Sequence, residues 1–198
     1  MGRKEEITSR IQSAALKEFV RKGVDSSTME RIAKSAGITK RTLYKYYSNK
    51  GIIYDELIDM LLDNFDAFSD FTYSGEIQIE EQLQEIIDTK VALLVSDDYQ
   101  NVSKLLSIEL LKSNPPKEKH LQRFHESENK FIKWIKDAQK DGTVTTEQTA
   151  ELIANQFHSI IKGQVFYPVI HGLAQLTKKD IDTCKKTAKD FFINSFCS

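Results

Sequence analysis

The residues best suited to chemistry in this chain form one short basic stretch. Arg41, Thr42 and Lys45 fall within five positions, with Tyr44 and Tyr46 beside them. At about 100° per residue, the first three share one face of a helix and the two tyrosines flank it. Two cations, a hydroxyl with its methyl group and two phenols can read base edges and hold phosphates in a major groove. The stretch therefore predicts a nucleic-acid contact, although a basic pair alone more often marks a solvated helix face.

The neighbouring residues predict how this helix is positioned. Gly37 can take the positive φ that ends a preceding helix, and Thr39 can cap the next helix through its hydroxyl. Leu43 and Tyr47 fall opposite the basic face, where they can pack against a helical bundle. Residues 32–50 thus have the sequence form of a helix-turn-helix, and the capped turn favours DNA binding over a solvated surface helix.

Two sets of spaced residues extend this pattern over about a quarter of the chain. They are Ile11-x-x-Ala14-Ala15-x-x-x-Phe19-x-x-x-Gly23 and Thr28-x-x-x-Ile32-Ala33-x-x-Ala36-Gly37-Ile38-Thr39-x-x-Thr42-Leu43-Tyr44-x-Tyr46-Tyr47-x-x-Lys50. With them, the chain from Ile7 to about Leu57 resembles the DNA-binding domain of TetR-family transcriptional regulators. One departure is Arg41, where many members have Gly or a small residue, so the family's base preference does not carry over to this chain.

The residues expected to contact double-stranded DNA come from the helix-turn-helix and its flanks. They are Thr28, Thr39, Lys40, Arg41, Thr42, Tyr44, Lys45, Tyr46 and Lys50. The resemblance implies that Thr28 and Lys50 touch phosphates. Thr28 could equally form an ordinary hydrogen bond at a helix N-terminus. A lysine at the start of a helix is unfavourable for the helix dipole, so a phosphate near Lys50 would compensate for that position.

Composition and charge fit a helical protein with one end suited to a polyanion. Of 198 residues, 40% are hydrophobic and only three are proline, and the net charge is −1. Residues 1–55 hold 12 Lys and Arg against six Asp and Glu, whereas the remainder holds 16 against 23. The first quarter therefore attracts DNA and the rest repels it. No apolar run approaches the ~20 residues of a membrane span, and the charged N-terminus lacks a signal core, so a cytoplasmic protein without membrane contact is expected.

Hydrophobic periodicity predicts an all-α fold of about nine helices, with no repeat and no convincing strand. The clearest spans are residues 3–22, 79–95, 99–113 and 117–140, with a fourth helix reaching about residue 70 and a kink or end at Pro168. Capping boxes are expected at Ser27 with Glu30, at Thr145 with Gln148 and at Thr177 with Asp180. The expected domains are a three-helix DNA-binding head over residues 1–50 and a helical ligand-binding and dimerisation body over residues 51–198.

The resemblance implies that the body binds a small molecule and forms a homodimer through its last two helices. The residues expected to line a ligand pocket are Phe65, Phe68, Leu94, Leu106, Leu110, Phe131, Trp134 and Phe157. Those expected at the dimer interface are Gly163, Phe166, Tyr167, Ile181, Cys184, Ala188, Phe191 and Phe192. Any single pocket residue is more often simply core, and His125 and His158 are more often structural or solvated than ligand-binding. An aromatic-lined cavity would suit a hydrophobic or planar effector.

Three hypotheses for function follow. The first is a dimeric repressor that reads a palindromic operator with recognition helices roughly 34 Å apart and releases it when an effector binds. The second keeps the helix-turn-helix but gives the body only a dimerisation or docking role. The third, a di-metal carboxylate enzyme, needs a Glu three residues before a His, which none of the four histidines has. No metal-spaced cluster, phosphate loop or nucleophile elbow occurs, so no catalytic residue, metal or cofactor is expected.

Overall fold

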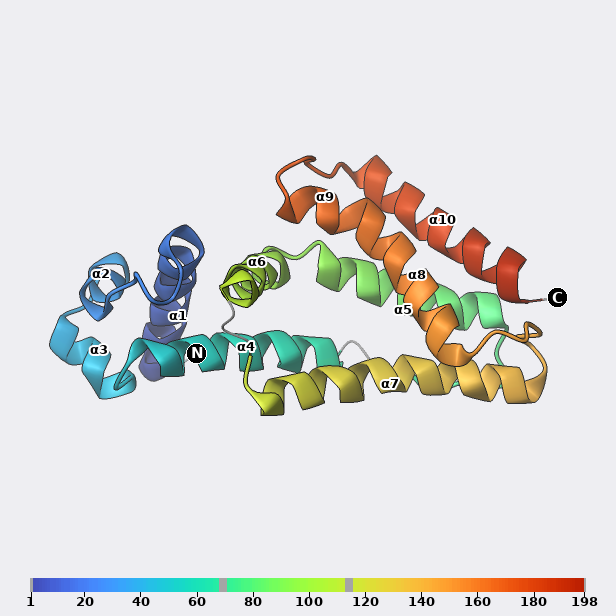
Figure 1. Cartoon of the computed structure of the whole chain (residues 1–198), viewed down its shortest axis with the longest axis horizontal. Coiled ribbons are helices and arrows are strands. Elements are labelled where there is room, and N and C mark those ends of the chain that lie inside the picture. Colours follow the sequence, from blue (N-terminus) through green and yellow to red (C-terminus); the bar gives the residue numbers. More distant parts are fainter. Residues whose placement is uncertain (1, 68–70, 113–115, 198) are drawn as a thin grey trace. The chain divides into compact units, whose positions relative to one another are not determined.

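The computed structural model describes residues 2–67, 71–112 and 116–197, leaving aside the side chains of residues 64–67. Within these ranges the chain forms ten α-helices and, apart from an isolated bridge between Val144 and Cys197, no β-structure (Figure 1). The helices are α1 (Arg3–Lys22), α2 (Met29–Ser35), α3 (Lys40–Tyr46), α4 (Lys50–Ala67), α5 (Ile79–Leu94), α6 (Asp97–Leu111), α7 (Glu118–Asp141), α8 (Ala150–Val165), α9 (Tyr167–Ile170) and α10 (Lys178–Phe196). The all-α prediction is confirmed. The additional helix is the short α9, whose first turn accommodates Pro168 because its nitrogen needs no hydrogen-bond partner there.

The described helices divide into two compact units. The head unit comprises residues 2–62 and 101–120, and the body unit residues 63–100 and 121–197, within the described ranges. Helices α4, α6 and α7 each continue from one unit into the other. The sequence did not indicate that residues 101–120 join the DNA-binding head, and the domain boundary after residue 50 stays a prediction. No helix in the described ranges has the length and apolarity needed to cross a membrane.

The head unit is built on a small apolar core. Ile11 and Phe19 from α1, Ile32 from α2 and Leu43 from α3 are completely buried. Each belongs to the apolar stripe of its helix, so burying the stripes against one another holds the three helices together. Full burial of one such side chain stabilises the fold by about 1.5–3 kcal/mol. The core therefore fixes the angle at which α3 presents its other face.

The start of α2 corrects the expected capping box at Ser27. Thr28 caps the helix instead, because its hydroxyl accepts a hydrogen bond from the Arg31 N–H at 3.3 Å. Ser27 is buried, and its hydroxyl donates to the Gly23 carbonyl at 2.7 Å. Ser27 thus stabilises the loop between α1 and α2, and Thr28 serves as the N-cap of α2.

The start of α8 also differs from the capping box expected at residues 145–148, and that prediction is wrong. Thr149 caps the helix by accepting a hydrogen bond from the Leu152 N–H at 3.3 Å. The Thr145 N–H donates instead to the Phe196 carbonyl at 2.8 Å. A tertiary contact with the end of α10 therefore overrides the local sequence signal.

Other helix boundaries agree more closely with the sequence. Thr177 and Asp180 form the predicted capping box of α10, and Asn49 caps α4 through its side-chain oxygen. α6 begins at Asp97, two residues earlier than expected, and acidic residues there suit the positive end of the helix dipole. The predicted continuation of the fourth helix to residue 70 lies outside the described residues.

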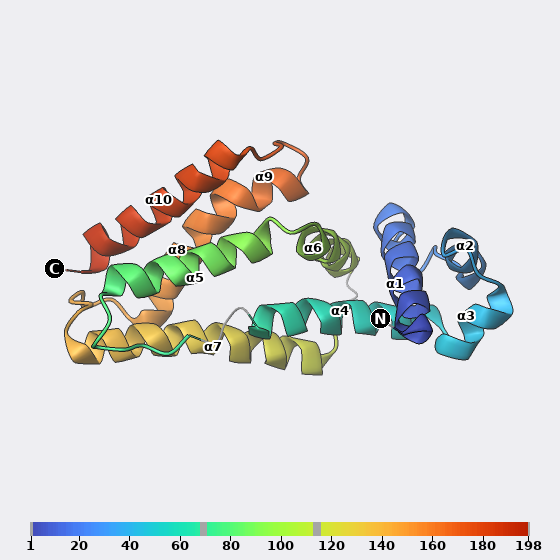
Figure 2. The same cartoon turned by 180° about the vertical axis from the view of Figure 1, so that it is seen from behind.

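In the body unit, α5, α8 and α10 pack against one another (Figure 2). The core of the unit is rich in aromatic side chains. Phe131 and Trp134 from α7, Phe157 from α8 and Phe192 from α10 are each at most 1% exposed. Phe131 stacks on Trp134 with ring centroids 5.9 Å apart, and Phe157 meets Phe192 edge-on at 5.7 Å. Aromatic pairs in these geometries add about 0.5–1.5 kcal/mol beyond their buried area. The rings thus connect α7, α8 and α10 within the body unit.

Candidate nucleic-acid interface

Helix α3 has one buried and one exposed face. Leu43 is completely buried and Tyr47 is 3% exposed, whereas Arg41, Tyr44 and Lys45 are exposed. The predicted orientation of the helix is therefore confirmed, while the roles of its residues at DNA stay a prediction. Two cations and a phenol on one exposed face can donate hydrogen bonds to base edges and phosphates.

The start of α3 is fixed by its own residues. The Thr39 hydroxyl accepts a hydrogen bond from the Thr42 N–H at 3.0 Å and lies 2.8 Å from the Thr42 hydroxyl. Gly37 takes a φ of 65° at the turn, as the sequence predicts, and a residue with a side chain would be strained there. Losing an N-cap such as the Thr39 hydroxyl typically lowers stability by about 1 kcal/mol. The chain therefore holds the turn without help from a ligand.

The end of α3 is tied to both neighbouring helices through one carboxylate. Tyr47 donates from its hydroxyl to Glu56 Oε2 of α4 at 2.6 Å, and Gln12 of α1 donates to the same oxygen at 3.2 Å. Burial, and then the hydrogen bond to Glu56, raises the pKa of Tyr47, so its hydroxyl stays protonated and keeps donating. Helix α3 is thereby clamped at both ends.

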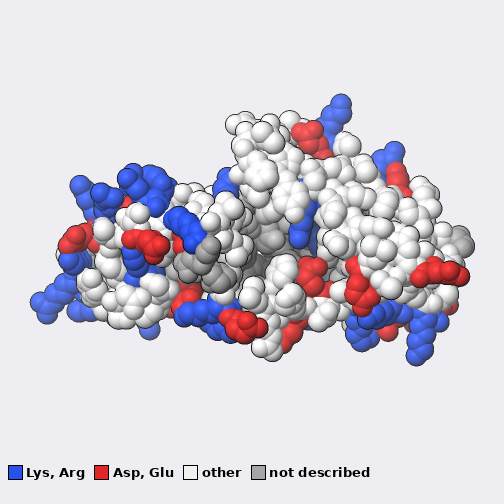
Figure 3. All heavy atoms as spheres, in the orientation of Figure 1, with Lys and Arg blue, Asp and Glu red and all other residues white. Residues whose placement is uncertain are grey.

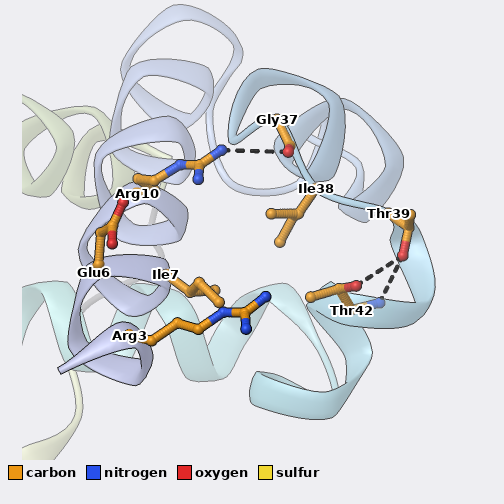
Figure 4. Close-up of a pocket in the computed structure, with 8 residues that line it drawn as sticks. All are labelled: Arg3, Glu6, Ile7, Arg10, Gly37, Ile38, Thr39 and Thr42. Atoms are coloured by element: carbon orange, nitrogen blue, oxygen red, sulfur yellow. Dashed lines mark hydrogen bonds between the residues drawn. The ribbon is translucent and has the colours of Figure 1, made fainter.

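Two arginines that the sequence analysis did not single out border α3. Arg10 of α1 donates to the Ala36 carbonyl at 2.6 Å and to the Gly37 carbonyl at 3.3 Å, which satisfies the end of α2. Arg3 extends toward Thr42 across a cavity of about 540 Å³ (Figure 4). Arg3 and Arg10 stand two helical turns apart on α1, and this spacing is the signal that could have found them. Arg10 supports the turn, and Arg3 places a further cation beside α3.

Lys50, at the start of α4, has partners inside the head unit. Its ammonium donates to the Asp25 carbonyl at 2.5 Å and to the Ser27 carbonyl at 3.0 Å. These bonds supply the compensation for the helix dipole that the sequence analysis assigned to a phosphate. An ammonium has three N–H donors, so it can still offer one to DNA. Lys50 therefore orders the loop between α1 and α2 whether or not it touches a phosphate.

The remaining predicted DNA contacts are exposed or partly exposed. Lys40 forms an ion pair with Glu30, and the hydrogen bond from Lys40 and then its charge hold the pKa of Glu30 below its usual range. Both side chains are exposed, so the pair contributes little to stability and a phosphate can displace the carboxylate. Thr28 is exposed while it caps α2, and Tyr46 is partly exposed at the end of α3.

Basic side chains gather on the head unit. Figure 3 shows Lys and Arg outnumbering Asp and Glu over α1, α2 and α3 on the face that it draws. The excess follows from the 12 basic and six acidic residues of positions 1–55. A surface of this sign attracts a polyanion and raises the rate at which the two meet.

Two matches to protein families cover most of the chain. Residues 11–57 match the bacterial regulatory proteins of the tetR family, and residues 81–197 match the C-terminal domain of AefR-like transcriptional repressors. The second match alone covers more than half of the 198 residues. The chain belongs to the TetR family of transcriptional regulators. It is therefore a DNA-binding regulator of the repressor type and not an enzyme, which confirms the resemblance read from the sequence.

Individual relatives of this TetR-family regulator match different shares of it. A stretch of 77 residues is 29% identical to the uncharacterized HTH-type transcriptional regulator YhgD of Bacillus subtilis strain 168, over 39% of this chain and 40% of YhgD. The chain thus spans two fifths of that relative's length. A TetR family regulator from Pseudomonas syringae pv. tomato DC3000 has a crystal structure with a TM-score of 0.74, 24% identity and 96% of each chain covered. The flavonoid-responsive regulator FrrA reaches a TM-score of 0.63 at 20% identity, over 96% of this chain and 97% of FrrA.

Four of the residues predicted to bind a ligand lie in the body unit of this TetR-family regulator. Leu94 is 6% exposed, and Phe131, Trp134 and Phe157 are at most 1% exposed. The three aromatic rings pack on one another, with Phe131 5.2 Å from Phe157 between centroids. They serve as core in this conformation, and a role in binding stays a prediction. Across the described ranges, no three His, Cys, Asp or Glu side chains come together in a way that could hold a metal ion.

Of the other four predicted ligand residues, two lie in the head unit and two cannot be compared with that core. Leu106 and Leu110 belong to the head unit, where Leu106 is half-buried and Leu110 is 50% exposed. The side chain of Phe65 and all of Phe68 lie outside the described residues. Apolar spacing placed Leu106 and Leu110 on one face of a helix, and spacing alone cannot tell which unit that face contacts.

Half of the residues predicted at a dimer interface are buried inside a single chain. Phe166 is 7% exposed, and Cys184, Ala188 and Phe192 are completely buried. They form part of the body core of the single chain, and their place at a dimer interface stays a prediction. An apolar stripe on an amphipathic helix looks the same whether it packs within a chain or between chains.

The other predicted dimer residues are accessible. Gly163 and Tyr167 are exposed, and Ile181 and Phe191 are half-buried. Phe191 also borders a groove of about 490 Å³ on α8 and α10, together with Leu152, Asn155, Gln156, Ser159 and Ile160. Leu152 is 46% exposed and was not singled out from the sequence.

Proposed function

We propose that this regulator is a homodimer that represses transcription at a palindromic operator and releases the operator when a small hydrophobic or aromatic ligand binds its body unit. The observation that carries the proposal is the exposed face of α3, where Arg41 and Lys45 point outward and Leu43 is completely buried behind them. A short helix anchored in this way can enter a major groove about 12 Å wide.

Each exposed side chain on this face has a role that its chemistry suits. Arg41 can donate two hydrogen bonds to O6 and N7 of a guanine. Lys45 is suited to a phosphate, since its ammonium acts as a point charge. Tyr44 offers a hydroxyl to the backbone, and the methyl group of Thr42 suits a thymine. Arg3 lies beside this set and adds a cation for the DNA backbone.

Dimerisation follows from the small size of α3. One helix of seven residues reads only a few base pairs, so a specific operator needs two copies with their recognition helices roughly 34 Å apart. A two-fold interface uses the same patch on both copies. Exposed and partly exposed residues of α8, α9 and α10 offer such a patch: Leu152, Ile160, Gly163, Tyr167, Ile181 and Phe191.

Helix α6 provides a route from the body unit to the head. Glu109 of α6 is completely buried, and its Oε1 accepts hydrogen bonds from the Val24 N–H at 3.1 Å and from Lys112 at 3.4 Å. Val24 lies in the loop that leads from α1 to α2. α6 begins in the body unit, so a ligand that shifts its start would pull on this loop. A coupling of 1–3 kcal/mol, which is typical of such systems, changes DNA affinity about 5- to 150-fold.

One observation favours a second candidate, in which the body only dimerises. The cavity described at Lys90 and Leu94 in the body unit measures about 20 Å³. Pockets for small ligands usually measure about 300–1,000 Å³, so a ligand would have to move helices to enter. The relationship to FrrA, named as flavonoid-responsive, supports the ligand-responsive candidate. The two candidates differ in whether any small molecule changes DNA affinity.

Selection of bound duplexes from a random pool, with the full chain, tests the proposal. We expect a palindrome whose half-sites are centred about 10 base pairs, or a multiple of that, apart. A single half-site would contradict the dimer, and no enrichment over bulk DNA would contradict sequence-specific binding. The selected duplex then serves as the probe for ligands. If the affinity for this duplex stays constant in the presence of flavonoids, aromatic acids and aliphatic chains, the candidate in which the body only dimerises is favoured.

A further inference from the structure

A cluster of charged side chains lies in the body unit, away from the DNA-binding helices. Lys90 of α5, Glu128 of α7, and His158 and Lys162 of α8 line one cavity of about 20 Å³. His158 and Lys162 stand four residues apart and so share one face of α8. Leu94 and Ile161 complete an apolar part of the wall. Three helices thus bring four polar groups to one small space.

Two members of the cluster are buried to a degree that is unusual for ionisable residues. Lys90 and His158 are each 9% exposed, and the Lys90 ammonium lies 4.9 Å from the centre of the Phe131 ring. Burial, and secondarily the charge of Lys162, lowers the pKa of Lys90 to about 8. Lysine almost never occurs in such surroundings without a specific reason.

His158 has one nitrogen in use and one that no group reaches. Its Nδ1 lies 2.9 Å from Glu128 Oε2, while its buried Nε2 has no hydrogen-bond partner among the described residues. Burial, and then the charge of Lys90, lowers the pKa of His158, so the imidazole is neutral near pH 7 and donates through Nδ1 to the carboxylate. Burial alone would raise the pKa of Glu128, but His158 and the two lysines outweigh it and hold the value at about 2.

The charges on the cavity wall do not balance. Near neutral pH, Lys90 and Lys162 are cations, Glu128 is an anion already bonded to His158, and His158 is neutral. A cationic ligand would be repelled by two ammonium groups, whereas an anionic one would be attracted to both. A single negative charge would balance the wall, and it would also raise the pKa of Lys90 and His158.

We propose that this cavity receives the carboxylate of a monoanionic effector, with Lys90 and Lys162 donating to the carboxylate oxygens and His158 offering Nε2 once it is protonated. The inference deepens the proposed function, since it rests on the body unit being the effector site. A cavity of 20 Å³ holds about one water-sized group, so only the head group fits as the helices stand. The apolar remainder of the effector separates α5, α7 or α8 as it enters, and that movement is the signal passed to the head.

The test uses two sets of probes that differ only in the head group. They are 3-phenylpropanoate, 3-phenylpropan-1-ol and 3-phenylpropan-1-amine, and octanoate, octan-1-ol and octan-1-amine. Binding to the full-length protein is measured by calorimetry for the wild type, for Lys90→Met and for Glu128→Gln. Lys185→Met is the matched control, because Lys185 is a half-buried lysine of the same unit that pairs with Asp88 at 2.8 Å and does not line the cavity.

We expect at least one carboxylate to bind, and its alcohol and amine to bind at least about tenfold more weakly. Lys90→Met should weaken carboxylate binding about tenfold or more, because it removes a buried partner of the charge. Glu128→Gln should strengthen it, since a competing anion is lost, and Lys185→Met should leave it unchanged. The proposal is overturned if neither carboxylate binds, if an alcohol or amine binds as tightly, or if Lys90→Met matches the wild type.

DNA affinity measured with the same probes separates this inference from the proposed function. A carboxylate that binds the body in a Lys90-dependent way but leaves DNA affinity unchanged upholds the anion site and contradicts effector-driven release. An alcohol or amine that releases DNA while the carboxylates do not bind upholds release and contradicts the anion site.

Discussion

The head and body units place their charged residues in opposite ways. In the head, Arg41 and Lys45 stand on an exposed face with an apolar core behind them. In the body, Lys90 and His158 are nine-tenths buried and share a cavity with Glu128. Exposed cations retain their hydration and can meet a long polyanion at many points, whereas a buried cation can meet only a small group that reaches it.

The placement of these charges determines which ligands each unit can discriminate. Exposed charges give attraction that depends strongly on salt and weakly on sequence, so the head needs Arg41 hydrogen bonds to distinguish one duplex from another. Buried charges are poorly screened by salt, so the body can distinguish an anion from a neutral molecule of the same shape.

The apolar platform of the head should show the largest effect. Leu43→Ala removes a completely buried side chain behind the exposed face of α3 and should lower the free energy of unfolding by about 2–5 kcal/mol. DNA binding should be lost with it, because α3 is no longer held. Leu111→Ala is the control, since Leu111 is 88% exposed in the same unit and should change stability by less than about 0.5 kcal/mol. Equal losses in a urea titration would contradict the assignment of Leu43 to the core.

Substitutions at Arg41 and Lys45 should separate the recognition of a base sequence from the general attraction to DNA. Arg41→Ala should cost about 1–3 kcal/mol on the selected duplex and relax the preference at one base of each half-site. Lys45→Ala should weaken binding to all duplexes alike and make the affinity for DNA depend less steeply on salt. Anisotropy titrations on the selected and scrambled duplexes check this, and matching losses for both variants on both duplexes would refute the division of roles. Lys50 is a poorer probe because its loss also frees the carbonyls of Asp25 and Ser27.

The buried lysine should make stability depend on pH in a defined direction. The folded pKa of Lys90 is about 8, and its ordinary value is 10.5. Between these values the unfolded chain binds a proton that the folded chain has released, so stability rises with pH. Relative to Lys90→Met, the wild type should gain about 1 kcal/mol in free energy of unfolding between about pH 8.5 and 9.5. Parallel pH curves for the two proteins would show that Lys90 is not held in a poorly solvated site.

The smallest effect should come from the surface pair of Lys40 and Glu30. Glu30→Gln frees Lys40 from a carboxylate that competes with phosphates, so DNA affinity should rise by less than about fivefold. The gain should shrink as salt is raised, because both side chains are exposed. Weaker binding by the variant, measured on any duplex at low salt, would show that Glu30 positions Lys40 for DNA.

Much of the head could be predicted from the sequence because its signals are local. The cap at Thr39, the turn at Gly37 and the burial of Leu43 each depend on residues within a few positions of one another. Arg10 was missed because its partners, the carbonyls of residues 36 and 37, are 26 and 27 positions away. The role of Lys50 was predicted only in part, because its partners, the carbonyls of Asp25 and Ser27, are also distant in sequence.

The body was predicted less completely because its contacts are distant in sequence. The hydrophobic periodicity correctly predicted that α8 and α10 are amphipathic. It could not show that Cys184 and Phe192 pack within the chain while Leu152 stays exposed. His158 was weighed as a lone histidine, since nothing local to it indicates Glu128 or Lys90. Clusters assembled from three helices are visible only once the helices are in place.

A salt titration of DNA binding shows whether the exposed basic face of the head reads DNA. Wild-type protein is titrated onto the selected duplex and onto a scrambled one between about 50 and 200 mM salt. If Arg3 and Lys45 of two copies each neutralise a phosphate, the slope of log K against log salt should be about −4. The selected duplex should bind far more tightly than the scrambled one at every salt concentration. A slope near zero, or equal affinity for both duplexes, would contradict an exposed basic head that reads DNA.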